Sequence, residues 1–144
     1  MQTFLPYADF RKSAQVLDYK RLGKQRVEAL QILNAIRGQT KGWVNHPCTV
    51  MWRGYEQALI QYAIVICEEW ISRGYKDTLL PRFKAQITTT NPEMPFWLGH
   101  GQLHLSHQSN LVRKDSNFYK FKVKNNLPYI WVKPDGTYYK GEIK

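Results

Sequence analysis

The sequence predicts an all-α fold, a compact single domain of three main helices with irregular connections and a basic, aromatic C-terminal tail. Apolar residues recur at helical spacing in three long stretches, whereas a proline-rich stretch and the tail lack this period. The length of 144 residues is that of one domain, so residues 1–144 are expected to form a single unit.

Two helices are expected near the N-terminus. The first covers about residues 9–17, with Asp9 as its N-cap. The second covers residues 19–36, and Gly38 supplies its stop. Gly23 lies inside the second helix and costs about 1 kcal/mol relative to alanine, so a break is expected there if anywhere.

Three further segments complete the prediction. A long helix is expected over residues 49–73, and residues 78–101, which contain three prolines, are expected to be mostly irregular. A last helix is expected over residues 106–118. Residues 129–139 are expected to form a short hairpin around a Pro-Asp-Gly turn.

Charge and composition narrow the function classes. Lys and Arg number 21 against 11 Asp and Glu, and the net charge of +10 favours a polyanion as partner. An apolar fraction of 43% excludes a disordered basic tail. The longest apolar run, residues 62–67, is far shorter than the roughly 20 residues of a membrane span, so no membrane partner is expected. No secretion signal is visible, and two cysteines without CxxC spacing favour a reducing compartment, so a cytoplasmic, nucleoid-associated location is expected.

A polar stripe marks the second helix. Arg21, Lys24, Gln25 and Glu28 share one helical face, and Lys20 lies beside them. One interpretation is a solvated face with a Lys24–Glu28 ion pair. The other is a face that grips phosphates and holds one carboxylate able to stabilise a developing cation.

A second group of polar residues surrounds the start of the next helix. His46 precedes that helix, and Arg53 and Glu56 lie one turn apart within it. His46 either caps and packs, or it shares a site with Glu56 and Glu28 if the two helices lie side by side.

Three histidines near residue 100 resemble a metal-binding spacing. His100, His104 and His107 follow an H-x3-H-x2-H pattern, but Gly99 and Gly101 argue against the helix that would align them. No metal site and no cofactor are therefore predicted. His104 and His107 are instead expected to contact phosphates or bases.

The C-terminal part interleaves cations with aromatic residues. Cations grip phosphates and aromatic rings stack on bases, so this mixture suits a nucleic acid. The alternative is that the rings complete the core while the lysines keep the chain soluble. Both interpretations hold if aromatic and basic side chains alternate along the chain, so that one set points inward and the other outward.

At this point the sequence resembles a known family. The string from Tyr19 to Val27, YKRLGKQRV, is similar to the first functional helix of the phage endonuclease V type of pyrimidine-dimer DNA glycosylase. The similarity continues through Arg53–Glu56, Arg73–Thr78 and Phe118–Lys120. The bacterial branch of the family is the more similar one, through Leu17–Leu33, Asn45–Pro47 and Ser106–Leu111.

The resemblance implies a bifunctional DNA repair enzyme on a compact all-α domain. In the family, an N-terminal α-amine attacks C1′ of a damaged nucleotide, releases the base, and forms an imine that permits strand cleavage by β-elimination. A carboxylate on the first functional helix assists, and neighbouring arginines hold phosphates. The implied partner is duplex DNA that contains a damaged or modified base, bound by a monomer.

This chain departs from the family pattern at two positions. Gln2 is too bulky for ordinary removal of the initiator methionine, so the amine of Met1 is the expected nucleophile. An α-amine is roughly 10–15% free base at pH 7, against about 0.04% of an ordinary lysine, and Lys24 is the second candidate. The family's catalytic glutamate aligns with Arg21, so Glu28 or Glu56 is expected to serve instead.

Three hypotheses of different classes follow: a DNA glycosylase with AP lyase activity, a non-catalytic nucleic-acid-binding domain on the same scaffold, and a histidine-dependent metallonuclease. The glycosylase is favoured. Its predicted catalytic residues are Met1, Glu28, Lys24, His46 and Glu56. Its predicted DNA contacts are Gln2, Lys20, Arg21, Gln25, Arg53, His104, His107, Asn110, Arg113, Lys114, Lys120 and Trp131.

Overall fold

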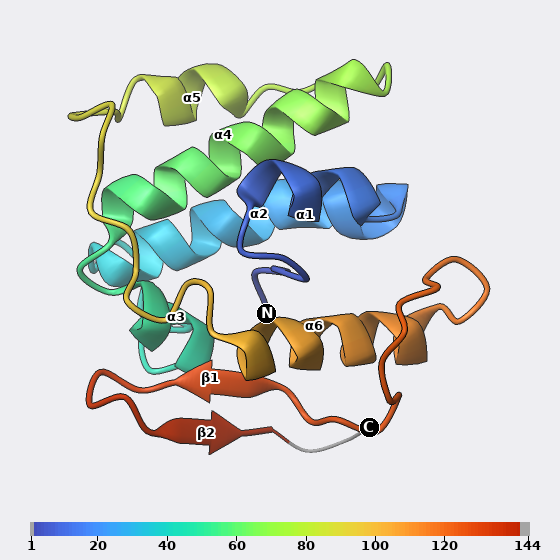
Figure 1. Ribbon diagram of the computed structural model, residues 1–144. Coiled ribbons are helices and arrows are strands. Elements are labelled where there is room, and N and C mark those ends of the chain that lie inside the picture. Colours follow the sequence, from blue (N-terminus) through green and yellow to red (C-terminus); the bar gives the residue numbers. More distant parts are fainter. Residues whose placement is uncertain (1, 142–144) are drawn as a thin grey trace.

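The fold consists of two groups of elements with the N-terminal strand between them, as the computed structural model of residues 2–141 shows (Figure 1). Helices α1, α2, α4 and α5 form one group, and α3, α6 and a two-stranded hairpin form the other. The elements are α1 (Phe10–Val16), α2 (Tyr19–Ile36), α3 (Pro47–Trp52), α4 (Glu56–Ser72), α5 (Leu80–Lys84), α6 (Gly101–Lys114), β1 (Ile130–Val132) and β2 (Tyr138–Lys140).

Side-chain caps start the first two helices where the sequence predicts them. The Asp9 carboxylate accepts a 2.8 Å hydrogen bond from the backbone N–H of Lys12, and Asp18 caps α2 in the same way. α2 continues through Gly23 without a break. A Cβ atom at this position would lie 2.8 Å from the ring of Trp70 on α4, so glycine is what lets these two helices approach.

The helix expected over residues 49–73 is two helices, which corrects that prediction. The chain turns between α3 and α4 at Gly54, whose φ of +88° is a left-handed conformation that favours glycine. α3 begins with Pro47 after an N-cap at His46, and the Nδ1 atom of His46 accepts from the N–H of Cys48 at 3.1 Å. Glu56 then starts α4 in a new direction.

Two other boundaries also differ from the prediction. α6 begins at Gly101 rather than near residue 106, because the left-handed Gly99 precedes the helix instead of interrupting it. It ends at Lys114 because Asp115 adopts an extended conformation and its side chain accepts from the N–H of Phe118. The segment expected to be irregular contains the short helix α5, with a proline in its first turn.

The predicted hairpin is present at the C-terminal end. β1 and β2 pair antiparallel with Trp131 opposite Tyr139. Within residues 2–141 the fold is dominated by helices, which confirms the predicted class at the level of a mostly α fold; the structure has six helices and a two-stranded sheet instead of three main helices alone. No helix in this range is long and apolar enough to cross a membrane.

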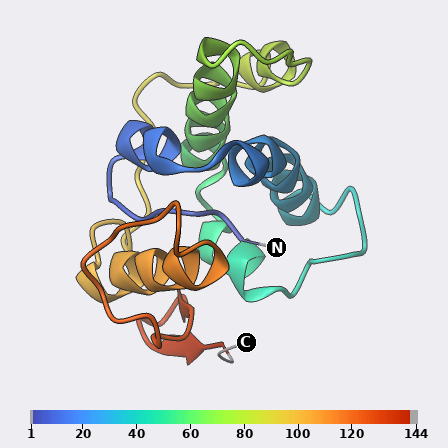
Figure 2. The ribbon, with the colours of Figure 1, turned by 90° about the vertical axis from the view of Figure 1, so that its right-hand side faces the viewer.

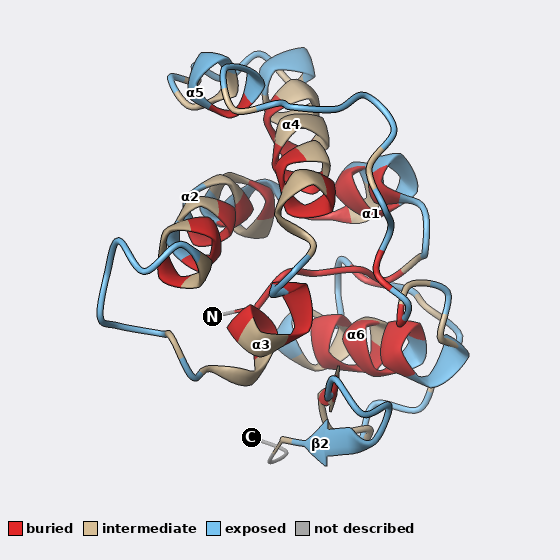
Figure 3. Cartoon of the chain, turned by 90° about the vertical axis from the view of Figure 1, so that its left-hand side faces the viewer, coloured by how far each residue is buried: buried red, intermediate tan, exposed pale blue. Residues whose placement is uncertain are grey.

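The core fills the space between the two groups of elements. Figure 3 shows buried residues along the facing sides of α2, α4 and α6 and along the N-terminal strand. At its centre the indole rings of Trp52 and Trp97 meet edge to face at 4.9 Å, and Phe10 meets Tyr62 in the same manner at 5.5 Å. This core holds the N-terminal strand in a fixed position between the helices.

Candidate functional site

The N-terminal segment, residues 2–6, here called the N-terminal strand, belongs to no helix or β-sheet and is buried. Figure 2 shows it passing between the two groups of elements. Side chains from the helices satisfy its backbone instead. Gln25 of α2 donates from Nε2 to the carbonyl of Gln2 at 2.8 Å, and its Oε1 accepts from the N–H of Phe4 at 2.9 Å. The hydroxyl of Tyr62 lies 2.7 Å from the same Oε1, which fixes the orientation of the amide.

Two histidines of α6 hold the strand from the other side. The Nδ1 atom of His107 accepts from the N–H of Leu5 at 2.9 Å, and His104 Nδ1 lies 2.8 Å from the Leu5 carbonyl. Burial lowers the pKa of His107 to about 3 and also lowers that of His104. The structure thus places both histidines against residues 2–6, with Nδ1 of each ring at the backbone of Leu5 and both rings buried.

Glu28 lies where the strand enters the domain. Its Oε2 accepts from the backbone N–H of Gln2 at 3.1 Å and from Nε2 of Gln25 at 3.2 Å. The residue is only 9% exposed. Lys24, on the same helical face, brings its ammonium group to 4.0 Å from Oε1 and remains largely exposed to solvent. The carboxylate therefore accepts two hydrogen bonds on one side and faces an exposed cation on the other.

A cavity of about 840 Å³ opens at this point between α2, α6 and the hairpin. Its walls combine five Lys and Arg side chains with aromatic rings, and among the described lining residues Glu28 is the only carboxylate. The lining consists of Gln2, Phe4, Lys20, Arg21, Lys24, Gln25, Glu28, His46, Pro47, Asn110, Arg113, Lys114, Tyr129, Trp131, Tyr139 and Gly141. A polyanion with a planar group is the ligand that such a lining suits.

Secondary contacts orient the cations of this cavity. Arg21 donates to the Asp18 carboxylate at 3.1 Å, and Asp18 is in turn hydrogen-bonded to the hydroxyl of Tyr119. Arg113 donates to the carbonyl of Asn125 at 2.6 Å. Burial lowers the pKa of Lys114, and the nearby cation of Arg21 lowers it further. The cations of the cavity therefore repel one another, and a bound anion would reduce this repulsion.

His46 contributes an uncharged donor to the same wall. Because its Nδ1 accepts the Cys48 N–H, the proton of the neutral ring resides on Nε2. Burial lowers the pKa of His46, so this neutral form predominates at pH 7. The ring meets Trp131 edge to face at 6.0 Å. His46 thus combines a capping role with an N–H group at the cavity.

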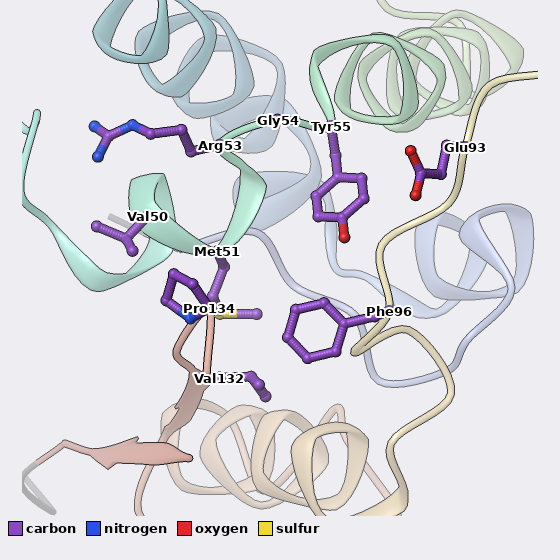
Figure 4. Close-up of a pocket in the computed structure, with 9 residues that line it drawn as sticks. All are labelled: Val50, Met51, Arg53, Gly54, Tyr55, Glu93, Phe96, Val132 and Pro134. Atoms are coloured by element: carbon purple, nitrogen blue, oxygen red, sulfur yellow. The ribbon is translucent and has the colours of Figure 1, made fainter. Parts of the chain in front are cut away.

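The structure places four other predicted residues away from this cavity or outside the described residues. Arg53 lines a second cavity of about 290 Å³, and its guanidinium extends away from the other lining side chains (Figure 4) and donates to the Val44 carbonyl at 2.7 Å. The Glu56 carboxylate accepts from the N–H of Gly54 at 3.4 Å and does not approach Glu28. Lys120 donates to the Ser116 carbonyl, and Met1 lies outside the described residues.

The histidine cluster does not form a metal centre in the described part of the chain. Between residues 2 and 141, no three His, Cys, Asp or Glu side chains are placed to hold a metal ion together. His100 lies against the tail instead, where its Nε2 is hydrogen-bonded to the hydroxyl of Tyr138.

A comparison with known protein families assigns this chain to one of them. A sequence profile described as pyrimidine dimer DNA glycosylase matches residues 1–81, more than half of the chain. The chain belongs to this family. Comparisons with curated proteins and with solved structures give no match. The resemblance seen in the sequence is thus confirmed at the level of the family, and a DNA repair glycosylase that acts on DNA is the activity that membership indicates.

The pyrimidine dimer DNA glycosylase match covers only one side of the cavity. It includes the N-terminal strand and α2, which supply Gln25 and Glu28. The opposite wall, with Arg113, Lys114 and Trp131, lies beyond the matched residues. The cavity of this chain therefore combines residues from the matched part, 1–81, with a basic, aromatic wall that the match does not cover.

The predicted site residues do not include Tyr62, nor the ring-bearing lining residues Phe4, Tyr129 and Tyr139. Tyr62 fixes Gln25 from inside the core, and Tyr129 and Tyr139 line the cavity. Tyr62 could have been found, because it stands at the start of the apolar run 62–67 and a buried hydroxyl group needs a hydrogen-bond partner. For Tyr129 and Tyr139 the sequence does not distinguish a ring that lines the cavity from a ring that completes the core.

Proposed function

We propose that this pyrimidine dimer DNA glycosylase excises a damaged pyrimidine from duplex DNA and then cleaves the strand as an AP lyase. The nucleophile of the proposal is the α-amine of Met1, and Glu28 is the assisting carboxylate. The lining cations of the 840 Å³ cavity would hold the phosphates that flank the damaged nucleotide.

One observation carries this proposal, the hydrogen bond from the Gln2 backbone N–H to Glu28. Only three covalent bonds separate an α-nitrogen from the next amide nitrogen, so the two atoms lie within about 3.7 Å of one another in any chain. For an α-amine on Met1, covalent geometry alone therefore limits the distance to Oε2 of Glu28 to about 7 Å. An amine and a carboxylate within reach of the same sugar are the two groups that imine chemistry at C1′ requires, which supports the proposal.

In the proposed reaction the α-amine is the nucleophile and Glu28 stabilises positive charge. The amine attacks C1′ as the bond between C1′ and the base breaks, and the base leaves with the electron pair and takes up a proton. The attacking nitrogen then loses a proton, and the C1′–O4′ bond of the sugar ring breaks with O4′ taking up a proton, which gives the protonated imine. Glu28 stabilises the positive charge that develops on the sugar and then on this imine. Loss of a proton from C2′ expels the 3′ phosphate in the β-elimination, and water finally releases the amine.

The α-amine is favoured over Lys24 as the nucleophile. Near pH 7 roughly 10–15% of an α-amine is unprotonated, several hundred times the share of an ordinary lysine. Lys24 is largely exposed, and its ammonium group faces the Glu28 carboxylate at 4.0 Å. Its position suits a phosphate contact better than an attack on C1′.

Duplexes that contain a single cyclobutane pyrimidine dimer, a single abasic site or no lesion test the proposal. On the dimer duplex, cleavage of one C1′–base bond and of the strand is expected, and the freed base stays joined to its neighbour through the cyclobutane ring. Strand cleavage alone is expected on the abasic duplex, and neither reaction on undamaged DNA. EDTA is expected to leave both activities unchanged, since no step uses a metal. Tight binding to all three duplexes without release or cleavage would overturn the proposal in favour of a non-catalytic DNA-binding domain, and loss of activity in EDTA would favour a metallonuclease.

A further inference from the structure

Tyr129 has a hydroxyl group to which the proposed reaction gives no role. The residue precedes β1 and lines the 840 Å³ cavity that contains Glu28. Between residues 2 and 141 the hydroxyl forms no hydrogen bond, and its oxygen is not among the polar atoms sealed from solvent, in contrast to the indole nitrogen of Trp131. The cavity therefore offers its ligand a hydroxyl donor that no described residue occupies.

Aromatic contacts hold the ring of Tyr129 in place. Its centroid lies 5.5 Å from that of Trp131, 6.0 Å from that of His107 and 6.4 Å from that of Phe4. The Tyr129 carbonyl accepts a 2.8 Å hydrogen bond from the N–H of Gly141. Because both the ring and the backbone are held, the hydroxyl has a defined position at the wall of the cavity.

Charged groups of the cavity act on this hydroxyl. Burial raises the pKa of Tyr129, and the Glu28 carboxylate raises it further, whereas the cations of Arg113 and Arg21 lower it. The net direction is upward, so the hydroxyl keeps its proton at neutral pH. A neutral O–H donor with two cations near it suits a group that gains negative charge during a reaction.

Departure of a base from a cyclobutane dimer puts negative charge on one particular oxygen. The dimer lacks the C5–C6 double bond, so N1 is conjugated with the C2 carbonyl alone, and the charge that N1 receives is shared with O2. Because this charge spreads no further, the base is a poor leaving group and benefits from a proton donor at O2. O2 faces the minor groove beside C1′, so a donor can reach it while the base remains in the stack.

We propose that Tyr129 donates its hydroxyl proton to O2 of the departing pyrimidine. The inference rests on the proposed function, because it takes attack at C1′ of a dimer as its starting point. As the C1′–N1 bond breaks, its electron pair passes to N1 and the C2 carbonyl, and the O–H bond of Tyr129 breaks as the O2–H bond forms. The tyrosinate then regains a proton from solvent, which balances the proton that the attacking nitrogen releases. Glu28 thus acts on the sugar and Tyr129 on the base.

Tyr129→Phe removes only the hydroxyl and tests the assignment on two duplexes. On the dimer duplex, the single-turnover rate of C1′–base cleavage is expected to fall by about 10²–10³-fold, as for loss of one donor to a developing oxyanion. On the abasic duplex no base departs, so strand cleavage and the borohydride adduct are expected to match those of the wild type. Affinity for both duplexes is expected to be unchanged, because the aromatic ring remains. A merely structural role would not separate the two substrates in this way.

A more acidic tyrosine separates proton donation from packing. With 3-fluorotyrosine at position 129, the ring and the hydroxyl are retained and the O–H group is a stronger acid. This protein is expected to cleave the dimer at least as fast as the wild type. A loss as large as that of Tyr129→Phe would contradict proton donation.

Tyr55→Phe is the matched control. Tyr55 is partly buried, as Tyr129 is, but it lines the second cavity (Figure 4). The Tyr55→Phe variant is expected to match the wild type on both duplexes. Equal losses of Tyr129→Phe on the dimer and abasic duplexes, or no loss on either, would overturn the inference and leave the proposed function standing. A wild-type protein that cleaves no C1′–base bond in the dimer duplex would overturn the proposed function, and this inference with it.

Discussion

The backbone N–H of Gln2 donates a 3.1 Å hydrogen bond to Oε2 of Glu28. This bond joins the start of the chain to the middle of α2, and Gln25 reinforces it by bonding to both the Gln2 carbonyl and the same carboxylate oxygen. The side chain that ties down the strand therefore also orients the carboxylate. A precisely held carboxylate beside the chain's N-terminal end is the basis of the proposed chemistry.

Replacement of Glu28 by glutamine tests the role of this carboxylate. Glu28→Gln keeps the shape and an acceptor for the Gln2 N–H but removes the negative charge that stabilises the developing cation. Base release is expected to fall by about 10²–10⁴-fold, the range typical for loss of a group that acts in the transition state. Affinity for the dimer duplex is expected to change little, as measured by titration with labelled DNA.

Glu56→Gln is the matched control for that substitution. Glu56 lies away from the cavity and bonds only locally, to Gly54. The turnover of the Glu56→Gln variant is expected to match that of the wild type. Normal turnover in Glu28→Gln, or a comparable loss in Glu56→Gln, would contradict the assignment.

Much of this site could be predicted from the sequence because it lies on one helix. The spacing of Arg21, Lys24, Gln25 and Glu28 puts them on one face of α2, and the structure brings that face to the cavity. The role of His107 was not predictable in the same way. It depends on a contact with Leu5, which is 102 residues away in the chain, and no local pattern encodes such a pairing. The break at Gly54 was missed for a related reason, since the apolar period continues across it.

Acid is expected to destabilise the protein through His107. Its pKa of about 3 in the folded state lies below the usual value near 6.5, so the unfolded chain binds the proton more readily. The stabilising contribution is therefore complete above about pH 6.5 and is lost as the pH falls toward 3. Between pH 7 and pH 5 the loss is about 2 kcal/mol in the free energy of unfolding, at 1.36 kcal/mol per unit over about 1.5 units.

Urea denaturation at pH 7 and pH 5 measures this loss. His107→Gln retains an acceptor for the Leu5 N–H and cannot titrate, so its stability is expected to fall about 2 kcal/mol less over the same interval. Identical pH dependence in the variant and the wild type would show that His107 is not the titrating group.

Gly23 is expected to resist replacement by alanine. Alanine favours a helix by about 1 kcal/mol over glycine, but its Cβ would lie 2.8 Å from Cη2 and Cζ3 of Trp70. Gly23→Ala is therefore expected to lower the free energy of unfolding by about 1–3 kcal/mol through overpacking. In a Trp70→Phe background, which lacks the outer ring atoms, the same substitution is expected to be neutral or stabilising. A Gly23→Ala protein more stable than wild type would exclude a close contact between α2 and α4 at this point.

DNA affinity is expected to depend steeply on salt. If the protein makes six to ten phosphate contacts, its affinity falls by about 10³–10⁵ between 50 and 200 mM salt. Lys24→Ala is expected to reduce the slope of log affinity against log salt by about 1, because the exposed Lys24 ammonium lies at the cavity. Arg53→Ala, at the second cavity, is expected to leave the slope unchanged. A flat salt response in wild type would contradict the proposed phosphate grip.

The most direct test of the proposed chemistry is reduction of the covalent intermediate with borohydride on a dimer duplex, followed by peptide mapping. The proposal predicts a stable protein–DNA adduct whose modified peptide carries the sugar on the α-amine of Met1, and no such adduct with Glu28→Gln. An adduct on a lysine peptide, or the absence of any adduct on both dimer and abasic duplexes, would contradict it.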